Sequence, residues 1–247
     1  MEHASQMTPS FIFQRLIASV RRTLRCLRSS DFDSNGGTNE TGFKNIVICS
    51  LQHILEDCED SGCGCEISSE HLIQVTDLDT KQKVTNYADI VVKIGDHFGL
   101  IIELKYVQAP FLEGYYSCPE KMPFPGPGDV PSMWYMKATS RRNALSAIGE
   151  ELANKAPEEL RALKFYEKFN ETTNCISVAT KEDTAIEQVK RYHSAMSNTQ
   201  PAFKWYAATI VGVVSNLVCA CVNFTLSDMT SERLITNIDD SDVTCKK

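Results

Sequence analysis

The sequence predicts an α/β domain in which helices pack around one sheet. Residues 88–107, "ADIVVKIGDHFGLIIELKYV", form two apolar runs around a short polar turn, a pattern typical of paired strands. Residues 43–58 and 183–196 instead repeat their apolar side chains at helical spacing. Residues 205–227 contain no charged residue and are rich in β-branched side chains, which predicts further buried strands.

Size and composition fit one globular domain with extra elements. The chain has 247 residues, of which 43% are hydrophobic and 23% are charged. The formal net charge of −7 excludes a global basic footprint, so nucleic-acid binding would need a local basic face or bound metal ions. Met1-Glu2-His3 does not open a signal peptide, and the ten cysteines are expected to be mostly reduced. We therefore expect an intracellular protein, cytoplasmic or nuclear.

Residues 11–28 form an amphipathic helix pattern with arginines on the polar face. We expect this helix to dock on the domain, while a nucleic-acid arm, a membrane-surface helix and an organelle-targeting peptide stay open. Residues 29–42 are expected to be a linker. The predicted organisation is an N-terminal segment and linker at 1–36, a domain at 37–228 and a tail at 229–247.

Residues 43–106 are expected to form one helix and three strands of the core. A helix at 43–58, with Glu40 just before it, is followed by an irregular strand at 65–79. Strands at 88–94 and 100–106 then flank a turn at 95–99.

An insertion of about residues 108–180 follows the second of these strands. Residues 121–132 contain four prolines and exclude a regular element there. Helical patterns follow near 137–155 and 157–169, and Thr180 with Asp183 resembles a capping box before the helix at 183–196. The cationic residues of the insertion alternate with glutamates, so a solvated mixed-charge face is favoured over a phosphate-binding face on which Trp134 and Tyr135 stack bases.

The uncharged stretch at 205–227 admits two interpretations. Its length approaches that of a membrane span, which needs about 20 apolar residues. Ser215-Asn216 interrupts it, so we favour two buried strands joined by a turn and expect no membrane association.

Asp89, Glu103 and Lys105 are the polar residues of the two apolar strands that most suggest chemistry. Side chains alternate along a strand, so Glu103 and Lys105 share a face. If the turn pairs Ile94 with Leu100, Asp89 lies opposite Lys105 and diagonal to Glu103, at about 7 Å. Two carboxylates at that separation can hold Mg²⁺, with the lysine beside its waters. A salt bridge at the sheet edge is the alternative.

This arrangement resembles the PD-(D/E)XK nuclease superfamily, whose signature is an acid opening one strand and Glu-x-Lys closing the next. The matching residues are Asp89 and Glu103-Leu104-Lys105, although Ala88 stands where the superfamily's name has Pro. Gln188 and Tyr192 share a helix face and resemble the Gln-x-x-x-Tyr motif of the RecB-like branch. "VCACVNF" resembles the closing strand of a branch found behind an ATPase-like domain, but the chain has no P-loop motif.

The resemblance implies a restriction-endonuclease-like core: a central mixed sheet flanked by helices, with a helical and Pro-rich insertion after the catalytic strand. It implies a nuclease that uses Mg²⁺ or Mn²⁺ to hydrolyse phosphodiester bonds, with DNA favoured over RNA. Asp89 and Glu103 would hold the metal with the Leu104 carbonyl, while Lys105 positions the attacking water. Gln188 and Tyr192 would support the site and contact substrate. An ATPase or other protein supplied in trans and a homodimer are the further partners it admits.

Three questions stay open at this point. Family members often add a helix glutamate as a metal ligand, and Glu40 is preferred here over Glu56. Some RecB-like nucleases hold an iron–sulfur cluster, but the cysteine spacing does not favour one (Cys58, Cys63, Cys65, Cys219, Cys221 and Cys245). The alternative function is a catalytically weak or inactive module on the same fold that binds nucleic acid or protein.

Overall fold

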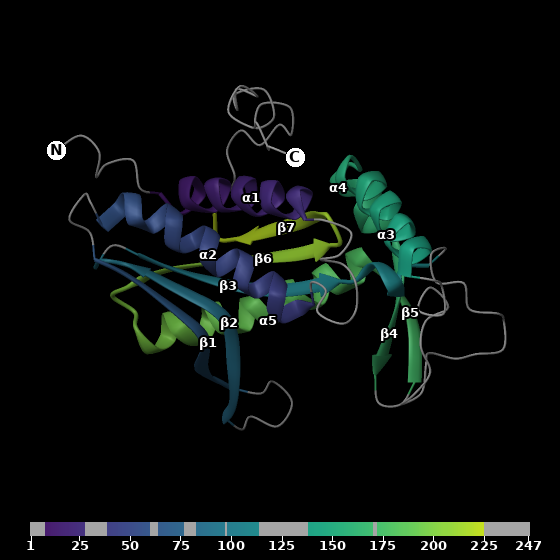
Figure 1. The fold of residues 1–247 in the computed structure, drawn as a ribbon. Coiled ribbons are helices and arrows are strands. Elements are labelled where there is room, and N and C mark those ends of the chain that lie inside the picture. Colours follow the sequence, from purple (N-terminus) through teal and green to yellow (C-terminus); the bar gives the residue numbers. More distant parts are fainter. Residues whose placement is uncertain are drawn as a thin grey trace.

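The computed structural model describes residues 8–27, 39–59, 64–76, 83–96, 98–113, 138–169 and 172–224. These residues form an α/β domain with a central mixed sheet flanked by helices, as the sequence predicts (Figure 1). The expected linker, the Pro-rich stretch at 121–132 with Trp134 and Tyr135, and the C-terminal tail lie outside the described residues.

The sheet has the strand order β1-β2-β3-β6-β7. Its strands are β1 (Cys65–Thr76), β2 (Lys83–Ile94), β3 (Phe98–Val107), β6 (Lys204–Val213) and β7 (Asn216–Val222). The β3–β6 pair is parallel and the other neighbours are antiparallel. A parallel pair needs a long crossover, and the insertion together with the following helix provides it.

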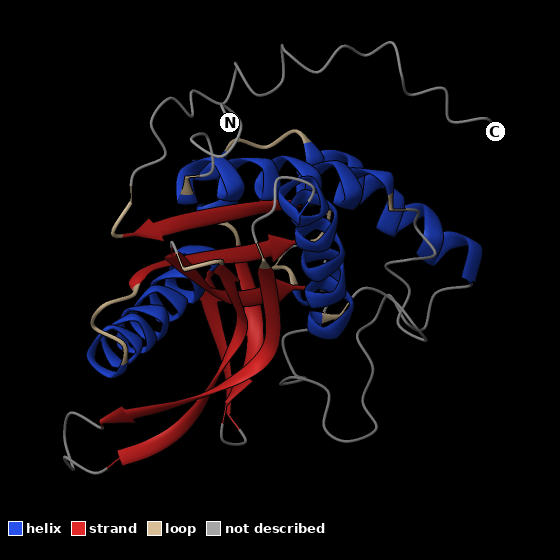
Figure 2. Ribbon diagram, turned by 90° about the vertical axis from the view of Figure 1, so that its left-hand side faces the viewer, coloured by secondary structure: helices blue, strands red, loops and turns tan. Residues whose placement is uncertain are grey.

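Helices cover both faces of this sheet (Figure 2). Helices α1 (Pro9–Cys26) and α2 (Glu40–Glu59) pack on one face, and α5 (Val178–Thr199) packs on the other. Apolar strand residues fill the space on each side, with Ile90 and Ile102 facing α1 and α2 and with Val91 and Ile101 facing α5. Because both faces are covered there, β3, β6 and the second half of β2 are apolar on both sides.

The amphipathic N-terminal helix is confirmed as α1, and it is part of the main core. Thr8 caps it by accepting a hydrogen bond from the Phe11 amide at 3.2 Å. Its apolar stripe is fully buried (Ile12, Phe13, Leu16, Ile17, Val20 and Leu24). The stripe therefore packs inside the domain, whereas a membrane-surface helix would need it free.

The predicted strands are confirmed, but the β1–β2 hairpin is longer than expected. Strand β2 begins at Lys83, five residues before the predicted start at Ala88. Its extra residues are mostly polar and pair with the second half of β1. Pairing to β1 makes this half a strand, because its two large apolar side chains, Val84 and Tyr87, are three residues apart and give no alternating pattern.

The insertion begins with a short 3-10 helix, η3 (Ala109–Phe111), and contains α3 (Ala138–Ala153) and α4 (Pro157–Ala162). The predicted helix at 157–169 is wrong beyond Ala162. The following residues form β4 (Lys164–Phe169), which pairs with an unpredicted β5 (Thr172–Ser177). Phe165 is buried and bridges to Leu112, so tertiary contact decides the strand conformation.

Helix α5 begins earlier than the sequence predicts. Ser177 is its N-cap, and the Ser177 hydroxyl accepts a hydrogen bond from the Thr180 amide at 3.0 Å. The expected capping role of Thr180 and Asp183 is therefore wrong, because both residues lie inside the helix.

The uncharged stretch is confirmed as two strands, β6 and β7, joined at Val214 and Ser215. Asn216 is buried, and its amide donates a hydrogen bond to the Leu152 carbonyl at 2.9 Å, at the end of α3. Among the described residues, no helix is both long and apolar enough to cross a membrane.

Candidate functional site

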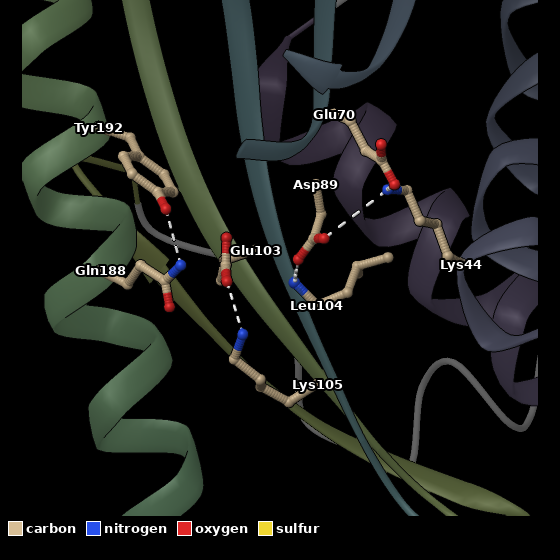
Figure 3. A network of polar contacts seen from close by, with 8 residues as sticks. All are labelled: Lys44, Glu70, Asp89, Glu103, Leu104, Lys105, Gln188 and Tyr192. Carbon is tan, nitrogen blue, oxygen red and sulfur yellow. Dashed lines mark hydrogen bonds and ion pairs between the residues drawn. The ribbon is translucent and has the colours of Figure 1, made fainter. Parts of the chain in front are cut away.

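The site lies where β2 and β3 diverge. Their pairing runs from Ile94 with Phe98 to Ile90 with Ile102. The Asp89 carboxylate then accepts a hydrogen bond from the Leu104 amide at 2.8 Å (Figure 3). A side chain thus replaces the backbone acceptor at this point, and β2 turns away from β3.

The predicted register is wrong by two residues. Ile94 pairs with Phe98 and not with Leu100. Continuing the observed pairing by one residue sets Asp89 opposite Glu103, where the prediction had placed Lys105. The strands no longer pair at this position, so the register sets Asp89 level with Glu103 without fixing the spacing of their carboxylates; after burial, the Asp89 charge is the largest contribution to the raised pKa of Glu103.

Glu103 is the most deeply buried acid of the site, with 1% of its surface exposed. Its Oε1 atom accepts a hydrogen bond from Lys105 Nζ at 2.7 Å. Its Oε2 atom is buried and has no partner among the described residues. A buried carboxylate oxygen is costly unless something binds it, so this atom marks a place for a donor or a cation.

Burial and the neighbouring charges together shift the pKa values of Glu103 and Lys105. Burial first, and then the Asp89 charge, raise the pKa of Glu103 to about 7, although Lys105 opposes the shift. Burial lowers the pKa of Lys105, but the contact with Glu103 and the charges of Asp89 and Glu40 outweigh it and raise the pKa. Lys105 is therefore a firm ammonium ion at neutral pH.

Glu40 is brought to the site and Glu56 is not. Glu40 is the first residue of α2, which corrects the expectation that it precedes the helix. Its charge contributes to the raised pKa of both Glu103 and Lys105. Glu56 lies sixteen residues further along α2, about 24 Å along the helix axis, and its carboxylate faces His53 at 3.5 Å.

Lys44 and Glu70 belong to the site but were not predicted. Lys44 Nζ lies 3.8 Å from the Asp89 carboxylate and 3.3 Å from that of Glu70. On β1, Glu70 lies between Ser69 and His71, which pair with the two neighbours of Asp89 on β2. Its φ of 52° is unusual for a residue other than glycine. Lys44 follows Glu40 by four residues on a helix, and that spacing was the available sequence signal. We find no comparable signal for Glu70.

Gln188 and Tyr192 lie on α5 beside Glu103, on the opposite side from Asp89 and Lys44 (Figure 3). The Gln188 amide donates a hydrogen bond to the Tyr192 hydroxyl at 2.7 Å. Burial raises the pKa of Tyr192; the Gln188 hydrogen bond opposes this shift, and the Glu103 charge adds to it. Gln188 and Tyr192 are therefore joined by a hydrogen bond, and the charge of buried Glu103 influences the Tyr192 hydroxyl.

The donor set fits a hard divalent cation. Within the described part of the chain, no group of three or more His, Cys, Asp and Glu side chains converges on one metal position. Mg²⁺ is usually bound through one or two carboxylates plus waters and substrate phosphate, and Asp89 and Glu103 supply two carboxylates. Among the described residues the Glu103 Oε2 atom has no hydrogen-bond partner, and the Asp89 Oδ1 atom lies 3.8 Å from Lys44 Nζ, so both oxygens fit that requirement.

The cysteines and the charged residues of the insertion are candidates for a cluster and for phosphate contacts, but neither role is favoured. Cys219 and Cys221 are partly buried on β7, and burial raises the pKa of both thiols, that of Cys219 to about 11. The Cys58 side chain, Cys63 and Cys245 lie outside the described residues. In the insertion, Lys155 forms an ion pair with Glu151, as expected for a mixed-charge face, whereas Arg161 pairs with Glu182, a buried residue of α5.

Comparisons with protein-family models, with curated proteins and with solved structures give no match to this chain.

Proposed function

We propose that the chain is a metal-dependent nuclease with a restriction-endonuclease-like core, which hydrolyses phosphodiester bonds in nucleic acid, DNA rather than RNA. The order of the motifs supports this proposal: Asp89 on one strand, Glu103-Leu104-Lys105 on the next, and Gln188 with Tyr192 on the following helix.

The observation that carries the proposal is the environment of Glu103. A carboxyl group that is 1% exposed, faces a second carboxylate and keeps one oxygen unpartnered is unfavourable for the fold alone. Perturbed groups of this kind concentrate at functional sites. A surface salt bridge would not need this burial.

Asp89, Glu103 and the Leu104 carbonyl would hold the metal, and Glu40 would add negative charge from α2. When bound, Mg²⁺ or Mn²⁺ would lower the pKa of a water molecule bound to it and would stabilise the negative charge that develops on the phosphate.

Lys105 acts beside this pair. It donates to Glu103 at 2.7 Å, and an ammonium group has three donors, so two remain for a water molecule or a phosphate oxygen. Its ammonium form persists at neutral pH, so it holds the attacking water and stabilises the anionic transition state. Gln188 and Tyr192 support Glu103 from α5 and provide polar groups toward the substrate.

The test is cleavage of labelled single- and double-stranded DNA and RNA with Mg²⁺, Mn²⁺ or EDTA. Asp89→Asn and Lys105→Ala are run beside the parent, and Lys93→Ala is the matched control because Lys93 lies on β2 and pairs with exposed Glu66. We expect metal-dependent cutting that both site variants lose, by about 100-fold or more, and that Lys93→Ala keeps.

Metal-dependent cutting that survives in both site variants would overturn the site. A folded parent that binds nucleic acid but cuts none of these substrates would favour the alternative, a binding module on the same fold.

A further inference from the structure

Thr209 lies beside Glu103 on the neighbouring strand. In the parallel pairing of β3 with β6, Thr209 is the direct partner of Glu103. The residues next to each of them in the chain belong to the core under α1 and α2, so both side chains lie on the opposite face, which α5 covers. Paired strands are about 4.8 Å apart. Thr209 is therefore the next side chain across the sheet from the most deeply buried acid of the candidate site.

Both residues have a buried polar atom without a hydrogen-bond partner. Among the described residues, four buried side-chain polar atoms form no hydrogen bond, and two of the four are Thr209 Oγ1 and Glu103 Oε2. Thr209 is fully buried, so bulk solvent does not reach its hydroxyl. Buried polar atoms are nearly always paired, because an unsatisfied one costs its full desolvation penalty. Two such atoms on directly paired residues point to one shared partner.

The chemistry of the two atoms is complementary. A threonine hydroxyl can donate one hydrogen bond, whereas an ionised carboxylate oxygen only accepts. They form no hydrogen bond with each other, so one water molecule that accepts from Thr209 and donates to Glu103 would satisfy both. Buried waters typically make about three hydrogen bonds to groups of this kind. Tyr192, beside Glu103 in Figure 3, offers a third, since its own hydroxyl proton is not used in the bond that it accepts from Gln188.

A second hydrogen bond would fix the orientation of the Glu103 carboxylate. Lys105 donates to one of its oxygens at 2.7 Å. The last side-chain torsion of a glutamate is broad, so this single bond leaves the plane of the carboxylate able to turn. Groups that hold a metal ligand in place typically change metal affinity or activity by about 10–100-fold. A carboxylate oxygen has two acceptor sites, so Oε2 can accept from a water molecule and still bind a cation.

We propose that Thr209 is a positioning residue of the candidate site: its hydroxyl donates to a buried water molecule that in turn donates to Glu103 Oε2, and this bridge holds the carboxylate in the orientation that binds the metal ion. The inference rests on the proposed nuclease function. It adds a residue of β6 to a site whose other residues lie on β1, β2, β3, α2 and α5. Thr209 contacts neither metal nor substrate in this role, and it acts through Glu103.

The experiment compares three variants with the parent. Thr209→Val keeps the shape of the side chain and removes the hydroxyl, and Thr209→Ser keeps the hydroxyl. Thr85→Val is the matched control, because Thr85 is exposed on β2. Calorimetric titration measures Mn²⁺ affinity without nucleic acid, and cleavage of the DNA or RNA that the parent cuts gives kcat and KM. Urea unfolding in EDTA verifies that each variant folds.

We expect Thr209→Val to weaken Mn²⁺ binding by about tenfold or more and to lower kcat by a similar factor, with KM for nucleic acid little changed. Thr209→Ser should restore both quantities, and Thr85→Val should match the parent. In EDTA, Thr209→Val should be less stable than the parent because Glu103 loses its bridge. A hydroxyl without a role would give the opposite result, since replacing an unsatisfied polar group by an apolar one stabilises the fold.

Mn²⁺ affinity and kcat that are unchanged in Thr209→Val, in a parent that binds Mn²⁺ and cuts, would overturn the role of Thr209 and leave the nuclease proposal intact. Equal losses in Thr209→Ser and Thr209→Val would also overturn it, because the methyl group and not the hydroxyl would then matter. A folded parent that neither binds Mn²⁺ nor cuts any nucleic acid would overturn both proposals together.

Discussion

Glu103 shows how one residue's surroundings set its chemistry. An unfolded carboxyl group titrates near 4.5, and burial beside Asp89 raises the pKa of folded Glu103 to about 7. Between these values the folded chain keeps a proton that the unfolded chain has released. The contribution of Glu103 to stability is therefore complete below pH 4.5 and is lost as the pH rises through 7.

Replacing Glu103 by Gln removes this titration. In EDTA, we expect the Glu103→Gln variant to gain stability relative to the parent between pH 5 and pH 8, by up to about 3 kcal/mol. Urea unfolding at the two pH values measures the gain, with exposed Glu66→Gln as the control. If the free energy of unfolding of the parent and of Glu103→Gln depended on pH in the same way, Glu103 would not be a buried carboxyl group with a raised pKa.

In the proposed nuclease, Lys44 would compete with the metal ion for Asp89. Its ammonium group lies 3.8 Å from the Asp89 carboxylate, and a divalent ion bound there would be repelled by it. We expect Lys44→Ala to bind Mn²⁺ several-fold more tightly than the parent in calorimetric titration. Lys190→Ala, in which an exposed lysine of α5 is removed, should match the parent. Weaker Mn²⁺ binding in Lys44→Ala would show that Lys44 organises the site instead of competing for it.

At the scale of elements, close packing of α2 on the sheet carries Glu40 and Lys44 to the site. Gly212 on β6 permits this approach, because a Cβ atom there would lie 2.6 Å from Tyr106 and 2.8 Å from Phe43. The Phe43 and Tyr106 rings stack with centroids 5.2 Å apart, so neither can yield freely.

We expect Gly212→Ala to lower the free energy of unfolding by about 1–3 kcal/mol and to slow cleavage, because Phe43 lies on α2 three residues after Glu40. Gly64→Ala is the matched control, since nothing lies within 4 Å of the Cβ position there. Denaturant unfolding and the cleavage assay measure both effects. Equal stability of the two alanine variants would mean that α2 does not depend on this contact.

At the scale of the whole molecule, the N-terminal helix and the sheet share one core. Leu16 on α1 is fully buried together with residues of α2 and of four strands of the sheet. We expect Leu16→Ala to destabilise the entire domain by about 2–5 kcal/mol in a single unfolding transition. Arg22→Ala, on the exposed side of the same helix, should stay within about 0.5 kcal/mol of the parent. A separate early transition in Leu16→Ala would show that α1 folds as an appendage.

Most elements of the core could be predicted because their apolar repeats are long and regular. The helices α1 and α2 and the strands β6 and β7 follow from periodicity and from the absence of charge. Strand β4 could not be predicted, because its six residues carry little periodic signal and the contact between Phe165 and Leu112 decides their conformation.

The site residues Asp89, Glu103, Lys105, Gln188 and Tyr192 could be named from the sequence, because they are close along strands and helices whose periodicity is clear. The register that brings Asp89 opposite Glu103 could not. A slip of two residues leaves every side chain on the same face of the sheet, so the hydrophobic pattern cannot distinguish the two registers.

The sequence by itself therefore determined the elements, their apolar faces and the acids and lysine of the candidate site, since these depend on local repeats. Only the tertiary structure decided which charges meet: Lys44 with Asp89 and Glu70, and Glu40 rather than Glu56 with Glu103. The physical reason is that these contacts join residues far apart in the chain, and their distances follow from how the helices and the hairpin pack on the sheet.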